Sequence, residues 1–174
     1  MAGSIVAEVP EYSSINLTFP GDVHHLPNNN IDSKIKGDTI RINNARHLPQ
    51  ASAEKQILNL KKTKGELVEL TLSNTELSLG SYLEAKEGFI RMSNSSQGEG
   101  KRLGASEQFE LLLEDKSSLK LLGLFKNEEE VFSKHRIFRI AIDSGSSLQV
   151  ENMKGCFEVI MKARAELKVK ECNF

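Results

Sequence analysis

The sequence predicts an all-β protein, organised as one hairpin-rich domain whose apolar faces pack against each other. The main observation is a sequence pattern that occurs three times, which we call the repeated line. It consists of a phenylalanine-led stretch of alternating apolar residues, a polar gap, and a second alternating stretch. Its copies begin at Phe109, Phe138 and Phe157. Alternation with a period of two places every second side chain on one face of a β-strand. One hairpin with an apolar face is unstable in water, so several must pack together as a barrel or a sandwich.

The gaps between the two halves of each copy favour turns. Residues 115–118 and 143–147 are rich in Asp, Ser and Gly, which are turn formers. Residues 162–166 have weaker turn chemistry, and apolar residues around them also recur at helical spacing, so a helix stays open as an alternative there. A looser fourth copy begins at Val68.

The N-terminal part of the chain has a different character. Residues 1–36 hold three of the four prolines, which predicts an irregular N-terminal arm with one edge strand at Ile15–Phe19. The all-β domain is expected to span residues 37–174. Its first strands are predicted at Thr39–Ile42 and Ile57–Leu60.

Turn residues divide the middle of the chain. A helical turn is expected near residues 51–55, and a turn at Lys64-Gly65. The stretch 80–90 has the pattern of a strand, a turn and a second strand, with Gly88 supplying a positive φ. Residues 93–107 contain three glycines and are expected to form a polar loop. The whole chain is expected to contain about 10–12 short strands and no long helix.

One stretch resembles a β-trefoil repeat. In fascin and in the fibroblast growth factors, similar lines run Gly-x-Tyr-Leu, a glycine turn, a short apolar strand and then a Phe-led strand. The matching positions here are Gly80, Tyr82, Leu83, Gly88, Ile90 and Phe109. The resemblance covers residues 65–150 and implies a β-trefoil, beside which other β-barrels and β-sandwiches stay open. The phenylalanine spacing is unequal, unlike that of trefoil repeats, and the Gln-x-Trp signature of ricin-type lectins is missing.

Composition and charge point to a globular protein without a nucleic-acid or membrane partner. The formal net charge is −1, and 39% of the residues are hydrophobic. Nucleic-acid and membrane partners usually leave a clear basic excess. The sequence shows no signal peptide and no apolar run long enough to span a bilayer. We therefore expect a cytoplasmic location with Cys156 and Cys172 reduced, although secretion is left open.

The chain carries no constellation of residues typical of catalysis, of a cofactor or of a metal. The His24-His25 pair lies in the Pro- and Asn-rich arm without further ligands at metal-site spacing. The stretch 98–106 has glycines and a lysine but lacks the Gly-Lys-Ser/Thr order of a phosphate loop. Cys156 is expected to be a small, half-buried hydrophobe. We therefore predict no catalytic residue, no cofactor and no metal.

Most of the sequence has the pattern of strands and turns, and few residues are arranged for reactivity. This indicates a non-catalytic binding module that presents loops to a protein or a glycan. The expected contacts come from the loop 93–107 and from the acidic turn 126–130. They are Ser95, Gln97, Glu99, Lys101, Arg102, Asn127, Glu128, Glu129 and Glu130. The alternative is a self-assembling structural subunit, either oligomeric or capsid-like. An enzyme with dispersed active-site residues is the third reading.

Overall fold

The computed structural model describes the backbone of residues 4–9, 14–18, 22–25, 31–36, 39–44, 56–60, 63–73, 75–126 and 138–173. Within this part, side chains are described for residues 68–72, 76–79, 84–125 and 138–173. The described residues form 14 strands and no helix, which confirms the all-β prediction. The strands are β1 Ser4–Val9, β2 Ser14–Thr18, β3 Asp22–His25, β4 Ile31–Lys36, β5 Thr39–Asn44, β6 Gln56–Leu60, β7 Thr63–Ser73, β8 Thr75–Ser93, β9 Gln97–Leu113, β10 Ser118–Lys126, β11 Phe138–Ile142, β12 Ser147–Lys154, β13 Glu158–Met161 and β14 Glu166–Asn173.

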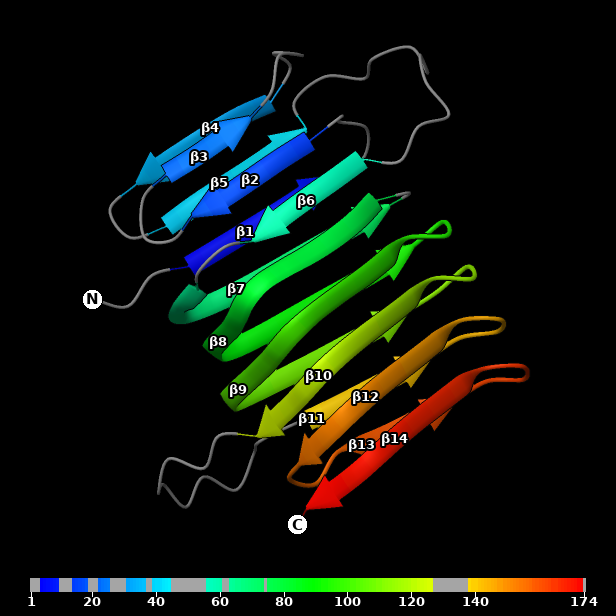
Figure 1. Cartoon of the computed structure of the whole chain (residues 1–174). Helices are drawn as coiled ribbons and strands as arrows, with labels where there is room; N and C mark the ends of the chain where they lie inside the picture. The colour runs from blue at the N-terminus through cyan, green and yellow to red at the C-terminus, as the bar shows by residue number, and fades with distance from the viewer. Residues whose placement is uncertain are drawn as a thin grey trace.

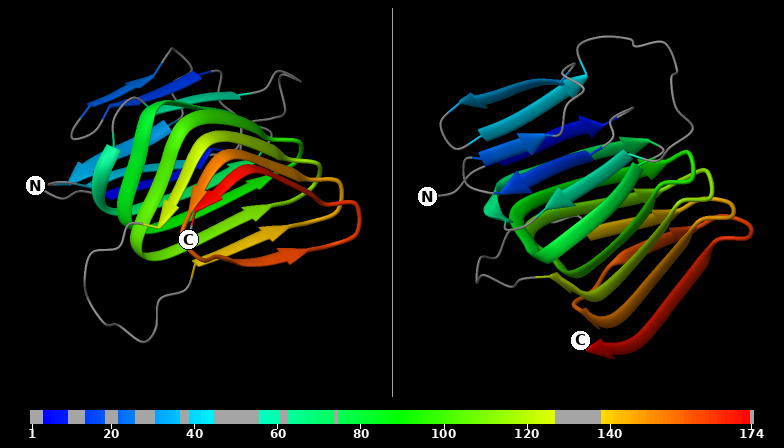
Figure 2. Two further views of the ribbon diagram at one scale, coloured as in Figure 1. Left: turned by 60° about the horizontal axis from the view of Figure 1, so that its bottom comes forward. Right: turned by 45° about the horizontal axis from the view of Figure 1, so that its top comes forward.

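The strands wind into a parallel β-solenoid of about four turns, in which each turn of the coil stacks on the one before (Figure 1). An end-on view shows that the coil has two layers joined at one edge by tight turns (Figure 2). Layer A contains β6, the first parts of β8 and β9, and then β10, β12 and β14. Layer B contains β7, the second parts of β8 and β9, and then β11 and β13. Strands β8 and β9 are long because each continues from layer A into layer B.

The N-terminal strands extend both layers. β1 pairs in parallel with β7 and β5, and β2 pairs in parallel with β6. The pairs β2–β3 and β4–β5 are antiparallel. Strands β2, β5 and β6 lie where strands were expected. Strands β1, β3 and β4 lie within residues 1–36, which were expected to be irregular apart from one edge strand. The division at residue 36 stays a prediction, and the helical turn expected near residues 51–55 lies outside the described residues.

The β-trefoil prediction is wrong, and the strands form neither a barrel nor a sandwich of hairpins. In each copy of the repeated line, the two alternating stretches lie in opposite layers and are not hydrogen-bonded to each other. Phe109–Leu113 pairs with Phe138–Ile142 of the following turn, and β10 pairs with β12 and with the first part of β9. Such a strand–turn–strand unit is a β-arch. Alternation reveals which side chains share a face but not which strand is the hydrogen-bonding partner, so hairpins and arches have the same sequence signal.

The repeated line is the repeat of the solenoid, and its copies stack in register. Phe109 and Phe138 are paired across β9 and β11. The ring of Phe157 meets both of them edge-to-face, with centroids 6.2 Å from Phe109 and 5.9 Å from Phe138. Inward-facing side chains of successive turns form continuous rows that make up the core. Its most deeply buried members include Leu70, Leu72, Leu77, Met92, Leu111, Leu113, Leu119, Leu121, Leu124, Ile140, Ile142, Leu148 and Val150.

Four tight turns stack along one edge of the solenoid, at residues 93–96, 114–117, 143–146 and 162–165. In each, the N–H of the fourth residue donates to the carbonyl of the first over 3.0–3.2 Å. Each also contains a residue with positive φ, such as Gly145 at 76°. The turns expected at 115–118 and 143–147 are thereby confirmed. The third copy also has its turn, between β13 and β14, so the helical alternative for that copy is wrong.

The polar loop expected over residues 93–107 is instead a tight turn followed by strand β9. Gly98 and Gly100 take inward positions at which later turns carry leucine or valine, and neighbouring leucines occupy the space. A Cβ added at Gly98 would lie 2.7 Å from Leu119 Cδ1, and one added at Gly100 would lie 2.5 Å from Leu79 Cβ. Because glycine replaces the apolar residues, the alternation disappears from the sequence, although the strand persists.

Two other expected turns are also wrong. Lys64-Gly65 lies inside β7, and the stretch 80–90 lies inside β8. Gly88 has no positive φ, because among the described glycines only Gly145 and Gly155 adopt one. β8 changes layer without a tight turn, through irregularities in its pairing with β9 between Leu79 and Tyr82 and between Ala85 and Glu87.

Candidate binding surface

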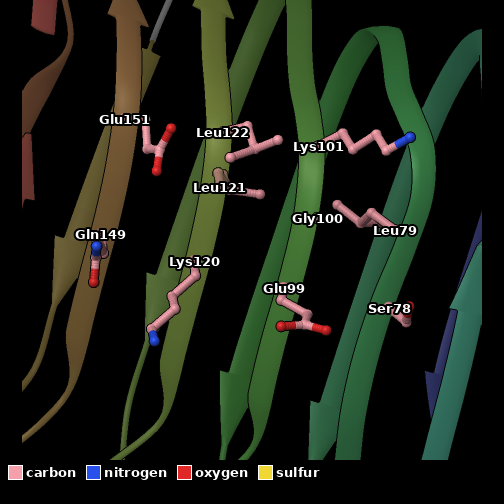
Figure 3. Close-up of a pocket in the computed structure, with 10 residues that line it drawn as sticks. All are labelled: Ser78, Leu79, Glu99, Gly100, Lys101, Lys120, Leu121, Leu122, Gln149 and Glu151. Atoms are coloured by element: carbon pink, nitrogen blue, oxygen red, sulfur yellow. The ribbon is translucent and has the colours of Figure 1, made fainter. Parts of the chain in front are cut away.

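The outer face of layer A carries a shallow hollow of about 420 Å³ that crosses β8, β9, β10 and β12 (Figure 3). Its lining residues are Ser78, Leu79, Glu99, Gly100, Lys101, Lys120, Leu121, Leu122, Gln149 and Glu151. A second hollow of about 310 Å³ shares Glu99 and Lys120 with the first and adds Glu76, Leu77, Gln97, Gly98 and Ser118. We treat the two as one site and call it the hollow surface.

Strand register places polar side chains in a row across layer A. Ser78 pairs with Glu99, Glu99 with Lys120, and Lys120 with Gln149. Neighbouring strands in a sheet are about 4.8 Å apart, so the row offers a polar group at that interval along the solenoid axis. A ligand lying across the strands would therefore meet a regular series of hydrogen-bonding groups.

Alternation explains why these side chains point outward. Lys120 lies between Leu119 and Leu121, which are 1% and 2% exposed, so its own side chain must leave the core. The alternation stops after Leu122, since Gly123 and the next residue are both buried. Leu122 itself is 51% exposed and gives the hollow surface an apolar patch.

The polar side chains of the hollow surface are not paired with each other. Within the described residues, no hydrogen bond or ion pair holds the side chains of Glu99, Lys101, Lys120, Gln149 and Glu151. The outer face of layer B differs, because Arg139 lies between two carboxylates there. Its Nη1 is 3.9 Å from Glu110 Oε1, and its Nε is 3.1 Å from Glu158 Oε2. The hollow surface thus keeps free donors and acceptors.

Two charged groups elsewhere on the described surface are held by local contacts. The guanidinium of Arg102 stacks over the ring of Phe125, 4.2 Å from its centroid. The pKa of Asp143 is lowered, first by the backbone N–H of Ser144, which donates to Oδ1 over 2.6 Å, and then by the Lys162 ammonium, 3.2 Å from Oδ2. Both sites lie outside the hollow surface.

The structure brings together three of the contacts expected from sequence. Gln97, Glu99 and Lys101 line the hollow surface, on a strand rather than on a loop. Ser95 lies in the turn 93–96 with a φ of 60°, and Arg102 follows the hollow surface on β9. Outside the described residues lie Asn127, Glu128, Glu129 and Glu130.

Sequence reasoning missed the residues that β10 and β12 contribute. Lys120, Leu122, Gln149 and Glu151 line the hollow surface but lie in the second halves of two repeat copies. The sequence does carry a signal for them, because Lys120 and Gln149 occupy equivalent positions when the copies are aligned. Equivalent positions are neighbours in space only if the copies stack side by side.

The histidines and cysteines that sequence analysis considered do not gather into one site in the described part of the chain. Among them, no group of three or more His, Cys, Asp and Glu residues is placed to hold a metal ion. His24 and His25 lie on β3, while His47 and His135 fall outside the described part. Cys156 and Cys172 are free thiols and both are exposed, so the prediction that Cys156 is half-buried is wrong. It lies in the connection between β12 and β13, not on a strand.

The fold and the hollow surface define a β-solenoid with an exposed polar face, and the comparisons with known proteins add no relative. No protein family model matches the chain. No curated protein and no solved structure matches it either. Within the part of the chain that the structure describes, no helix is long and apolar enough to cross a membrane.

Proposed function

We propose that the protein is a non-catalytic binding module that holds a neutral, hydroxyl-rich glycan chain on the hollow surface. The observation that carries this proposal is the set of unpaired polar groups of both signs across four neighbouring strands. Lys101 and Lys120 supply positive charge, and Glu76, Glu99 and Glu151 supply negative charge. Because the two signs are interspersed and nearly cancel, the surface has no strong net field that would favour an ionic ligand.

A glycan suits this surface because sugar hydroxyls both donate and accept hydrogen bonds. The carboxylates of Glu99 and Glu151 accept, the ammonium groups donate, and the Gln149 amide does both. The exposed Leu122 offers an apolar contact for the C–H face of a sugar ring. The hollow is open and shallow, so we expect an extended ligand that lies across the strands, bound through several weak contacts.

The test is binding of neutral oligosaccharides to the full chain, first on an array that also carries acidic oligosaccharides and then by isothermal titration calorimetry. Replacing Glu99 and Lys120 together by Ala removes one hydrogen-bond acceptor and one donor from the centre of the row. A hydrogen bond contributes about 0.5–1.5 kcal/mol net, so losing two weakens binding by about tenfold.

The matched control is the Glu107→Ala, Lys116→Ala double variant, because both residues are exposed and lie outside the hollow surface. It is expected to bind as the unmodified chain does. Absence of binding to every neutral oligosaccharide, or binding that survives the Glu99 and Lys120 changes, would contradict the proposal. Chemical turnover of a bound glycan would contradict its non-catalytic part.

A further inference from the structure

The last turn of the solenoid leaves apolar side chains uncovered. Val159, Ile160 and Met161 of β13 are 38%, 45% and 45% exposed. One turn earlier, the equivalent inward residues Ile140 and Ile142 are 0% and 1% exposed, because β13 covers them. The face formed by β13 and β14, which we call the terminal face, therefore exposes the inward residues Val159 and Met161, while Ile160 lies beside them on the outer face of layer B.

The terminal face also has unpaired backbone edges. Among the described strands, β13 pairs only with β11, and β14 pairs only with β12. An open strand edge beside exposed apolar side chains is a template on which a further strand can add. The end-on view shows both strands at the front of the coil, joined by their tight turn (Figure 2).

Charges alternate in sign along the rows that lead to the terminal face. On layer B the row runs Glu110, Arg139, Glu158, with the arginine contacting both carboxylates. At the turn edge the row runs Asp143, Lys162, with Nζ 3.2 Å from Oδ2. A strand that continued these rows would place a cation beside Glu158 and an anion beside Lys162.

The β13 sequence supplies this complement itself. If β13 pairs antiparallel with its own copy about a two-fold axis at Ile160, Glu158 lies opposite Lys162, and Val159 lies opposite Met161. The Glu158–Lys162 pair then forms twice, once on each side of the axis, and the rows become Glu110–Arg139–Glu158–Lys162 and Asp143–Lys162–Glu158 across the two copies. Side chains directly opposite each other in an antiparallel pair lie on the same face, so the inward apolar residues meet as well.

The same axis produces a matching pair on layer A. The turn 162–165 joins β13 to β14, so Ile160 lies across the coil from Leu167. Centring the antiparallel β14 pair on Leu167 puts Glu166 opposite Lys168. One two-fold axis thus satisfies both layers, as an isologous interface requires.

We propose that the terminal face is a dimer interface at which β13 and β14 pair antiparallel with those of a second copy of this chain. The sheets of the two solenoids then join over residues 158–162 of layer B and over residues 166–168 of layer A, and the inward residues Val159 and Met161 become buried. The interface is separate from the hollow surface, which lies on the outer face of layer A. Glycan binding and dimerisation can therefore succeed or fail independently.

The first test is sedimentation of the full chain across the micromolar range. We expect a monomer–dimer equilibrium, weakened at least tenfold by Ile160→Lys, which places two lysines opposite each other on the axis. The matched control is Leu112→Lys, in the same outward row two strands further in, which is expected to dimerise normally. Circular dichroism of both variants checks that they stay folded.

The second test fixes the register. In a chain whose Cys156 and Cys172 are changed to Ser, the substitution Ile160→Cys puts two thiols on the two-fold axis. Cα atoms of directly opposed residues are about 4.5–5.5 Å apart, which a disulfide can bridge, so oxidation is expected to cross-link the dimer. Leu112→Cys serves as the control that does not cross-link. A monomer throughout the concentration range, an unlimited growth of oligomers, or a dimer unaffected by Ile160→Lys would overturn the proposal.

Discussion

Three serines occupy the last position of three stacked turns and are completely buried. Ser96, Ser117 and Ser146 are each 0% exposed. The Ser96 hydroxyl donates to the Ser93 carbonyl over 2.7 Å, and the Ser146 hydroxyl oxygen accepts from the Ser117 N–H over 3.2 Å. Within the described residues, the hydroxyl of Ser117 has no hydrogen-bonding partner. The fourth turn carries Ala165 at this position, so the turn itself does not need a hydroxyl.

Ser117→Ala is therefore expected to leave stability unchanged or to raise it by up to about 1 kcal/mol, since a buried unpaired polar group is costly. Ser96→Ala makes the same change one turn earlier and breaks a hydrogen bond, so it should cost about 1 kcal/mol. Urea unfolding of the two variants, compared with the unmodified chain, measures both effects. Equal losses for the two serines would show that the Ser117 hydroxyl has a partner in solution.

The inward glycines of β9 give a second matched pair. A Cβ at Gly100 would lie 2.5 Å from the Cβ of Leu79, an atom that moves only with its backbone. Gly100→Ala is therefore expected to cost about 1–3 kcal/mol, as overpacked cores do. At Gly98 the nearest atom is the far end of the Leu119 side chain, which can rotate away, so Gly98→Ala should cost less. If thermal unfolding gave Gly98→Ala a lower melting temperature than Gly100→Ala, the result would contradict this packing.

At the scale of the elements, sequence could locate strands and turns but not strand partners. The three Phe-led copies and two of their turns were predicted correctly, because side-chain alternation and turn chemistry are local properties. Parallel pairing between turns joins residues far apart in the chain, such as Leu111 and Ile140, and leaves no mark on local alternation. β9 could not be located for a different reason. Glycines occupy its inward positions, so the apolar alternation with a period of two is missing there.

The candidate site was predictable to a similar extent. Gln97, Glu99 and Lys101 were identified as exposed polar residues next to each other in sequence, and they do lie together. Lys120 and Gln149 join them only through the stacking of β10 and β12 on β9. A surface assembled across strands is visible from sequence only when the repeat is recognised as a solenoid repeat.

A core residue in an inner turn should contribute more to the free energy of unfolding than the equivalent residue in the turn formed by β13 and β14. Ile140 and Val159 occupy the same row on adjacent strands, but Ile140 is 0% exposed and Val159 is 38% exposed. Ile140→Ala is expected to cost about 2–5 kcal/mol, the usual range for a fully buried aliphatic residue. Val159→Ala should cost less than half of this in the monomer. Urea unfolding at concentrations where sedimentation shows only monomer tests the difference, and equal costs would mean that the terminal face is covered in solution.

For the whole molecule, the solenoid makes stability a property of neighbouring turns. Each turn contacts mainly the turns before and after it, so the free energy of opening is approximately a sum of local and nearest-neighbour contributions. β9 is paired on both edges in each layer, whereas β13 and β14 are paired on one edge among the described strands. The turn formed by β13 and β14 therefore loses fewer interactions than an inner turn when it opens.

Hydrogen exchange should reveal this difference as a gradient along the stack. In the monomeric Ile160→Lys variant, the amides of β13 and β14 are expected to exchange at least about tenfold faster than those of β9, because they can open without disrupting the inner turns. In the unmodified chain, protection of β13 and of the first residues of β14, 166–168, should rise with protein concentration, while that of β9 stays constant. Peptide-level mass spectrometry resolves the three strands. Uniform exchange across the three strands would mean that the solenoid opens as one cooperative unit. Protection of β14 that does not depend on concentration would show that its edge is unpaired in solution.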